Sequence, residues 1–252
     1  MLKLTNIIAI TVTLICSNSV LQAAETQPVV EAYSCNYLAG KNQKDLDIAV
    51  DFWQKGIDKI GSKAMQSYFA SIMTPLYATT DVDFHWLGSN VDLNTWAAGN
   101  SDYTSSKFGA SADAKFKKMS KCKTNLYFSS PLYTGFTPAP ESTGALMMTA
   151  ACKLKDGATM ADVKVTEAMR IAELTANAAT FSVYKLIPYI ANTPNDLVYL
   201  IVHSDLNAFA SAGTMQLASK TWMASSKKFN SAMQCESALY TTRLVHSPLA
   251  AM

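Results

Sequence analysis

Apolar and polar positions change their spacing at regular intervals along the chain, and this pattern predicts alternating strands and helices. Residues 29–38 are rich in strand-forming side chains, and Gly40 and Asn42 then interrupt the run. Residues 44–60 place apolar side chains near helical spacing. The remaining elements of the first half are strands over 66–77, 81–87 and 123–133, with helical stretches beginning at Asp92, a good capping residue, and over 111–120.

The same order of elements returns in the second half, which indicates an internal repeat. Asp92-Leu93-Asn94 matches Asp205-Leu206-Asn207 at an offset of 113, and Cys122 matches Cys235 at the same offset. Upstream the offset is 117, which pairs Cys35 with Cys152. The second half is predicted to hold strands over 146–154, 180–190, 197–203 and 237–245, and helices over 160–177 and 205–233.

These matches divide the chain into two repeats with short flanking segments. The repeats are predicted over 29–133 and 145–246, and the Pro- and Gly-containing stretch 134–144 is the linker between them. Residues 247–252 form a tail. Residues 1–24 are typical of a secretory signal peptide, because a lysine precedes a short apolar run that ends in small residues at Ala23 and Ala24. We therefore expect a secreted or periplasmic protein, and an uncleaved anchor is the alternative.

The element order strand–helix–strand–strand–helix–strand is the ferredoxin-like plan. Two such units in one chain resemble the tandem form of the dimeric α/β-barrel superfamily, in which two sheets close face to face. The resemblance implies an α+β fold: two tandem ferredoxin-like βαββαβ repeats that pack as an intramolecular pseudo-dimeric α/β barrel. A chain that closes its own barrel is expected to be a monomer.

Cleavage of the signal peptide would leave four cysteines, an even count that suggests two disulfides in an exported protein. In the ferredoxin-like plan the first and fourth strands are antiparallel neighbours. The plan therefore pairs Cys35 with Cys122 and Cys152 with Cys235, one disulfide per repeat. No cysteine has a partner at the spacing of a zinc site or a C-x-x-C redox motif, so we expect a structural role and no metal.

Charge and motifs exclude several functional classes. The formal net charge is +2, from 21 Lys and Arg against 19 Asp and Glu, which argues against nucleic-acid binding. No second long apolar run follows the N-terminus, so no transmembrane segment is expected in the mature chain. Metalloprotease, nucleophile-elbow and nucleotide-binding motifs are missing, and no cofactor is predicted. A run of basic side chains is interpreted as a solvated helix face, with binding of anionic lipid as the alternative: Lys115, Lys117, Lys118, Lys121 and Lys123.

His85 is the first candidate for a ligand-binding residue. It lies in the predicted strand 81–87, where Phe84 and Trp86 share one face and His85 and Leu87 share the other. The matching position of the second repeat is Val198, so a buried imidazole replaces an apolar side chain. His85 is interpreted either as a ligand contact or proton acceptor in a pocket, or as a core histidine with a hydrogen-bond partner.

Trp86, Trp96 and Tyr103 lie close together along the chain and could form the wall of a pocket for a flat apolar ligand. The alternative is that these side chains are core residues. Phe209, which is also large and apolar, matches Trp96 in the second repeat.

Two functional hypotheses follow. The first is a disulfide-stabilised binding or structural protein whose partner is a small apolar ligand or another envelope protein. The second, implied by the resemblance alone, is a cofactor-independent monooxygenase in which His85 supplies the polar group. The superfamily also includes haem-binding members, but no motif places a haem-ligating histidine in this sequence.

Overall fold

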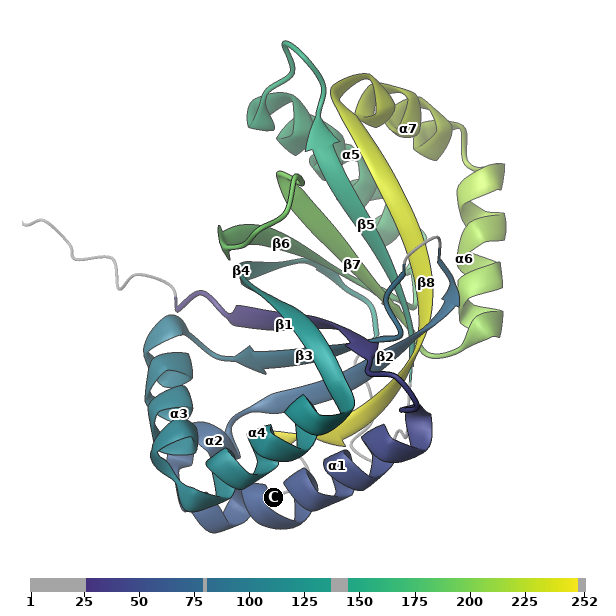
Figure 1. Cartoon of the computed structure of the whole chain (residues 1–252). Coiled ribbons are helices and arrows are strands. Elements are labelled where there is room, and N and C mark those ends of the chain that lie inside the picture. The colour runs from purple at the N-terminus through teal and green to yellow at the C-terminus, as the bar shows by residue number, and fades with distance from the viewer. Residues whose placement is uncertain (1–25, 79–80, 137–144, 249–252) are drawn as a thin grey trace, which may run out of the picture.

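We describe a computed structural model of the chain over residues 26–78, 81–136 and 145–248. The predicted signal peptide, most of the predicted linker and the end of the tail lie outside the described residues. The structure is a mixed α+β fold with a closed antiparallel barrel at its centre (Figure 1). The order of elements within 29–134 and within 146–246 follows the same sequence of strands and helices, with one additional short helix in the first half.

Eight strands form the barrel in the order β1-β3-β2-β8-β5-β7-β6-β4. The pairs β2–β8 and β4–β6 join the two halves of the chain, so neither half closes the barrel alone. The strands are β1 (Val29–Tyr37), β2 (Phe69–Tyr77), β3 (Phe84–Asn90), β4 (Ser120–Thr134), β5 (Leu146–Leu154), β6 (Ser182–Ile190), β7 (Leu197–His203) and β8 (Met233–His246).

Helices cover the outer surface of the barrel in two separate groups, one contributed by each half (Figure 1). The first group is α1 (Gln43–Ile57), α2 (Lys63–Gln66), α3 (Leu93–Ser105) and α4 (Lys107–Met119), with a 3₁₀ turn over Asp58–Ile60. The second group is α5 (Met160–Ala176), α6 (Leu206–Ala218) and α7 (Lys220–Ala232). None of the described helices combines the length and the apolar character that a membrane crossing requires.

Each strand has an inner face, toward the barrel interior, and an outer face, toward the helices. The inner faces bring together apolar side chains from all eight strands, and the outer faces pack against the helices in separate clusters. Because alternate residues of a strand point to opposite sides, both faces are buried. The inner core includes Val30, Met73, Leu87, Tyr127, Met147, Leu186, Leu200, Val202 and Tyr240.

The predicted disulfides are confirmed. Cys35 lies directly opposite Cys122 in the β1–β4 pair, and Cys152 lies opposite Cys235 in the β5–β8 pair. The capping role predicted for Asp92 is also confirmed, because its carboxylate accepts a hydrogen bond from the backbone N–H of Thr95 at 2.7 Å.

Most predicted elements differ from the structure by a few residues at their ends, and three differences have a clear physical reason. The strand predicted from residue 66 begins at Phe69, because Ser62 caps the short helix α2 in front of it. The strand predicted over 81–87 lies over Phe84–Asn90, since β1 offers it a partner as far as Val29. The helix predicted over 205–233 is two helices, divided at Ser219, whose hydroxyl accepts from the N–H of Trp222.

A candidate ligand-binding cavity in the first half

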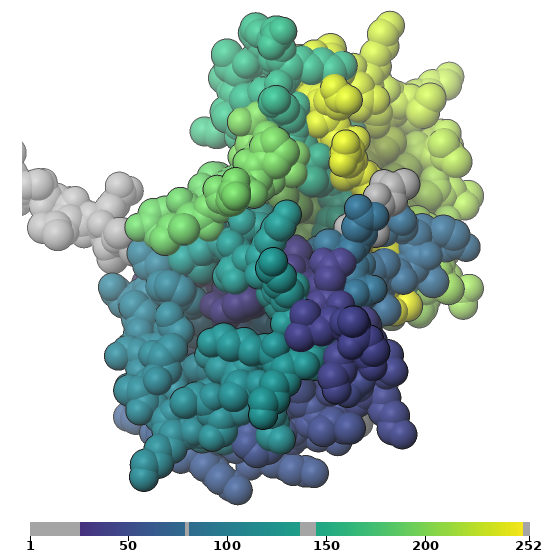
Figure 2. Space-filling view, viewed as in Figure 1, coloured from purple at the N-terminus to yellow at the C-terminus, as the bar shows by residue number. Residues whose placement is uncertain are grey.

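A cavity of about 650 Å³ lies between the outer faces of β1 and β3 and the helices of the first half. Figure 2 looks toward this hollow: teal residues of α4 and β4 border it, and purple atoms of β1 lie at its base. Its volume is in the range of small-molecule sites. Its wall is largely aromatic, with Tyr33, Trp53, Tyr68, Phe84, Trp86, Trp96, Tyr103 and Phe116.

Glu31 provides a carboxylate at the base of the cavity. One of its oxygens accepts a hydrogen bond from the Tyr68 hydroxyl at 2.5 Å. The other accepts from the Trp96 indole N–H at 2.9 Å and from the Tyr33 hydroxyl at 3.3 Å. Trp86 donates its indole N–H to the Tyr68 hydroxyl at 3.0 Å, which fixes the direction in which Tyr68 donates. Four aromatic side chains therefore hold one carboxylate in place.

Gly88 makes this arrangement sterically feasible. It lies opposite Glu31 in the β1–β3 pair, and its missing side chain leaves the space that the Tyr68 ring occupies. A Cβ atom at this position would lie 1.8 Å from the Tyr68 hydroxyl oxygen. Tyr68 directly precedes β2, and the glycine allows its side chain to extend across β3 to Glu31 of β1.

A second carboxylate, Asp113 of α4, also lines the cavity. It accepts a hydrogen bond from the Tyr103 hydroxyl at 3.2 Å. Burial, followed by the charges of Glu31 and Asp113, raises the pKa of the Tyr33 hydroxyl. Burial also raises the pKa of Tyr103, with Asp113 and more weakly Glu31 contributing. Both phenols therefore stay protonated near neutral pH and serve as donors to the carboxylates.

Asn90, which lines the same cavity, has a buried polar atom without a partner in the described structure. Its side chain is only 6% exposed, and its Oδ1 atom has no hydrogen-bond partner among the described residues. An orphaned buried acceptor is uncommon in folded proteins, because it loses its hydration without compensation. Asn90 lies on the outer face of β3, in line with Trp86 and Gly88, and it lines the cavity.

The mouth of the cavity is more polar and includes exposed cations. Lys117 and Lys121 border it, together with Asn100 and Thr104 of α3. The Cys35–Cys122 disulfide also lines the wall, so a covalent cross-link joins β1 to the first residues of β4 beside the cavity.

Three of the four predicted ligand contacts line this cavity, namely Trp86, Trp96 and Tyr103. His85 does not join them, because it is the neighbour of Trp86 in β3 and therefore points to the inner face. There its Nδ1 atom lies 3.0 Å from the Ser34 hydroxyl, and its ring packs edge-on against Tyr240 with centroids 5.2 Å apart. The geometry corresponds to the core-histidine interpretation, with Nε2 left without a partner in the described structure.

Burial of His85 predicts an acid-dependent loss of stability. Desolvation lowers the pKa of the imidazole to about 4, whereas an unfolded chain protonates it near pH 6.5. Stability should therefore be complete above about pH 6.5 and fall as the pH drops toward 4. The difference corresponds to about 3 kcal/mol. Urea unfolding at pH 7.5 and pH 4.5 should show a smaller loss in His85→Val than in wild type, and equal losses would contradict this assignment.

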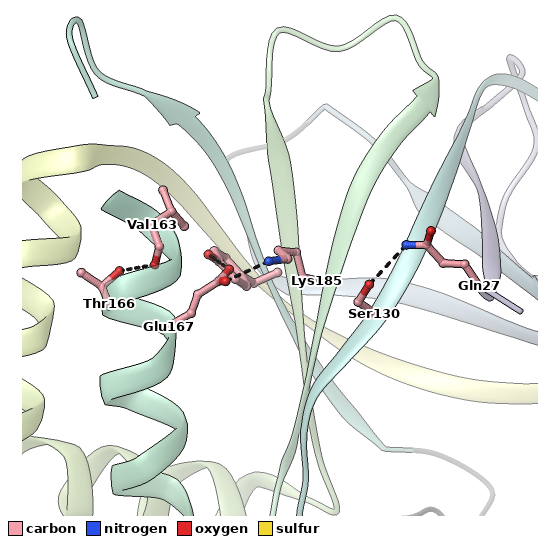
Figure 3. A network of polar contacts seen from close by, with 7 residues as sticks. Gln27, Ser130, Val163, Thr166, Glu167 and Lys185 are labelled. Carbon is pink, nitrogen blue, oxygen red and sulfur yellow. Dashed lines mark hydrogen bonds and ion pairs between the residues drawn. The ribbon is translucent and has the colours of Figure 1, made fainter. Parts of the chain in front are cut away.

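The corresponding region of the second half differs in chemistry. Met148 pairs with Ile201 across β5–β7, in the register that Glu31 and Gly88 hold across β1–β3, so no carboxylate stands there. Instead Glu167 of α5 points to Lys185 of β6, with nitrogen and oxygen 2.8 Å apart (Figure 3). The Tyr199 hydroxyl donates to the same carboxylate at 2.7 Å.

The histidines do not fit a histidine-ligated haem in the cavity, since none of the three lines it. His85 faces the barrel interior. His203 packs between the rings of Phe181 and Phe209. His246 contacts the backbone oxygen of Tyr68 through Nδ1 at 2.5 Å. Within the described residues, no group of His, Cys, Asp and Glu side chains is arranged to hold a metal ion.

Comparison with solved structures identifies the fold. A candidate monooxygenase from Fusobacterium nucleatum superposes with a TM-score of 0.57 at 9% identity, over 87% of this chain and 93% of that chain. The chain has the dimeric α/β-barrel fold. An anthrone oxidase-like protein gives a TM-score of 0.55 at 9% identity, over 91% and 98% of the two chains. A mutant chlorite dismutase from Candidatus Nitrospira defluvii gives 0.52 at 8% identity, over 86% and 92%.

The predicted resemblance to the α/β-barrel superfamily is therefore confirmed at the level of fold. No protein-family model matches the sequence, and no curated protein sequence is significantly similar to it. Identities near one residue in ten do not transfer an activity or a ligand to this chain.

Glu31, Tyr68 and Asp113 carry most of the polar chemistry of the cavity, and none of them was predicted from the sequence as a site residue. A signal for Glu31 was available: it is the sole charged residue of the first strand, and the offset of 117 matches it with Met148. Tyr68 and Asp113 gave no comparable signal, since each is brought to the cavity by packing of distant elements.

Proposed function

We propose that this protein binds a small aromatic molecule in the cavity of its first half. The observation that carries the proposal is a preformed, aromatic-walled space with a fixed carboxylate inside it, that of Glu31, which three donors hold. Core packing alone would fill this space. A flat ring that offers at least one donor would fill it and bond the carboxylate.

Calorimetric titration with 2-naphthol, a flat neutral ring with one hydroxyl donor, tests the proposal. We expect one molecule bound per chain. Thr104 lies at the mouth of the cavity, so Thr104→Trp should weaken binding at least about tenfold by obstructing entry. Ser105→Trp is the matched control, because Ser105 is the next exposed residue of α3 and does not line the cavity. No binding to wild type, or equal weakening in both variants, would refute the proposal.

We further propose that the protein works outside the cytoplasm as a monomer built from two copies of one unit. The two disulfides support an oxidising compartment. The shared element order and the two equivalent disulfide positions support duplication over 29–133 and 145–246. Closure of the barrel within one chain supports the monomeric state. Sedimentation of the mature protein and N-terminal sequencing after export test the two claims.

Oxygenation of the bound molecule is the second candidate function. It is favoured by the fold shared with a candidate monooxygenase and an anthrone oxidase-like protein, together with a carboxylate inside the aromatic cavity. In this hypothesis Glu31, not His85, accepts the proton that leaves the substrate carbon. One anthrone and one O₂ would give one anthraquinone and one water. Oxygen uptake with anthrone that Glu31→Gln abolishes would support it, and uptake equal to the protein-free rate would refute it.

A further inference from the structure

We propose that the ligand of this cavity is an organic cation, an arylalkyl amine whose ammonium group lies beside Glu31 and Asp113. The inference rests on the proposed binding function and specifies the chemical class of ligand. It follows from three features of the cavity: its free polar atoms, its uncompensated negative charge and its aromatic wall.

The two carboxylates of the cavity have free acceptor positions. A carboxylate offers about four lone-pair positions, and the donors around Glu31 use three of them. The open position is on the oxygen that receives only the Tyr68 hydroxyl. Asp113 receives a single hydrogen bond. A ligand that satisfies this set must bring several donors, as an ammonium group does.

The two carboxylates of the cavity carry negative charges that the described part of the chain does not pair. Neither Glu31 nor Asp113 forms an ion pair with any residue that the structure describes. Removing a carboxylate from water without a counter-charge is costly. The raised pKa values of Tyr33 and Tyr103, after the effect of burial, include contributions from both carboxylates, so the two charges act on a common region. A cation placed there compensates both.

The wall of the cavity suits a cation equally well. Trp53 and Trp86 meet edge to face with centroids 5.1 Å apart, and Tyr68 lies 6.2 Å from Trp53 by the same measure. The faces of indole and phenol rings attract cations, most strongly where water is excluded. The same rings accommodate the aromatic part of the ligand, so one site serves both ends of an arylalkyl amine.

The second half shows how this fold compensates a carboxylate with its own residues. There Lys185 of β6 lies opposite Tyr199 of β7 and pairs with Glu167. The corresponding position of the first half, opposite Trp86, is Ile72. At the offsets of 117 and 113, Glu167 and Lys185 correspond to Val50 and Ile72, so both members of this ion pair are apolar in the first half. Glu31 lies at a different place, on β1, and has no ion-pair partner among the described residues, so a bound ammonium group would supply its counter-charge.

Lys117 and Lys121 set the direction of the ligand. Both are exposed and border the mouth, whereas the carboxylate of Glu31 is at the base. Lys117 lies one helical turn after Asp113 in α4, so the ammonium group is expected nearer to Glu31 than to the mouth. An anionic ligand would instead remain near the mouth, and this difference can be tested.

The test compares three probes that share one ring: 2-naphthylmethylamine, 2-naphthylmethanol and 2-naphthoate. At pH 7 the first is a cation, the second is its neutral isostere and the third is an anion. We expect calorimetry to show the amine binding at least about tenfold more tightly than the alcohol, with the carboxylate weakest. Added salt should weaken the amine more than the alcohol.

Variants assign this preference to the carboxylates. Glu31→Gln should remove most of the preference for the amine while 2-naphthylmethanol still binds. Asp113→Asn should reduce the preference for the amine less than Glu31→Gln does. Because Asp113 accepts a single hydrogen bond, this variant is expected to fold and so tests the carboxylates even if Glu31→Gln misfolds. Asp51→Asn on the exposed side of α1 changes the net charge equally and should leave the preference intact.

The outcomes distinguish failure of the cationic-ligand inference from failure of the proposed binding of an aromatic molecule. If the alcohol binds as tightly as the amine, the inference of a cationic ligand is wrong, and the proposal of an aromatic binding site still holds. If 2-naphthoate binds most tightly, the lysines at the mouth determine the ligand and the inference is overturned. If none of the three probes binds, the proposed function fails with it.

Discussion

Removal of the Cys35–Cys122 disulfide, as Cys35→Ser/Cys122→Ser, should lower the free energy of unfolding by about 4 to 5 kcal/mol. The cross-link spans 87 residues, and in the chain-entropy model a loop of this length restricts the unfolded chain by that amount. Because the bond joins β1 to β4 beside the cavity, we also expect weaker binding of 2-naphthol. Urea unfolding and calorimetry measure the two effects.

The second disulfide provides the matched control. Cys152→Ser/Cys235→Ser opens a cross-link of 83 residues, so its cost in unfolding free energy should be nearly the same. It lies in the other half and does not line the cavity, so 2-naphthol affinity should be preserved in the folded fraction. Hydrogen exchange should show lost protection mainly within 29–133 for the first variant. Equal loss of ligand affinity in both variants would contradict a local role for Cys35–Cys122.

The Glu167→Ala variant should lose about 3 to 5 kcal/mol of stability, the second large effect we expect. The substitution leaves the Lys185 ammonium buried without its partner, and it removes the acceptor of the Tyr199 hydroxyl. Lys185 is only 8% exposed, so water cannot easily replace the carboxylate. Denaturant unfolding at pH 7 measures the loss.

A double variant distinguishes the cost of an unpaired charge from the value of the pair. Glu167→Leu/Lys185→Met replaces both ions by apolar side chains and should recover most of the stability. The exposed pair Lys41–Asp45 is the control. Asp45→Ala should cost far less than Glu167→Ala, because water solvates both charges of this pair and the loss comes mainly from the helix cap that Asp45 supports. A double variant as unstable as Glu167→Ala would show that packing, not charge, dominates at this site.

The two halves share one order of strands and helices but differ in what lies between the outer face of the sheet and the helices. In the second half an ion pair and large side chains occupy the space between sheet and helices. In the first half Tyr68 occupies the space over Gly88, and aromatic side chains line the cavity around Glu31 without filling it. The inner faces meet in a common apolar core, so a cavity can exist on one side while the barrel remains intact.

The strands were predicted most accurately where a run is apolar and bounded by turn residues. The strands over 146–154 and 197–203 have their predicted bounds as β5 and β7. Helix ends were predicted less accurately, because capping by Ser62 and Ser219 is a local hydrogen bond that the apolar spacing does not reveal. The strand β3 extends to Asn90 only because β1 lies beside it.

For the site, the sequence identified Trp86, Trp96 and Tyr103, since bulky aromatic side chains near a strand and its following helix tend to meet. It grouped His85 with them, although the alternation of a strand already placed His85 on the other face. Glu31 and Asp113 come from elements some 80 residues apart, and their proximity depends on how α4 packs over β1.

The sequence by itself determined the order of elements, the cysteine pairing implied by that order and the alternation of the strands, because each is set by local spacing or by the topology it implies. The tertiary structure decided which outer face remains open and which carboxylate lies at its base. Those features depend on distant side chains that meet only when the helices settle on the sheet, such as Tyr68 passing over Gly88 to reach Glu31. The spacing of apolar and polar residues along the chain does not predict such a contact.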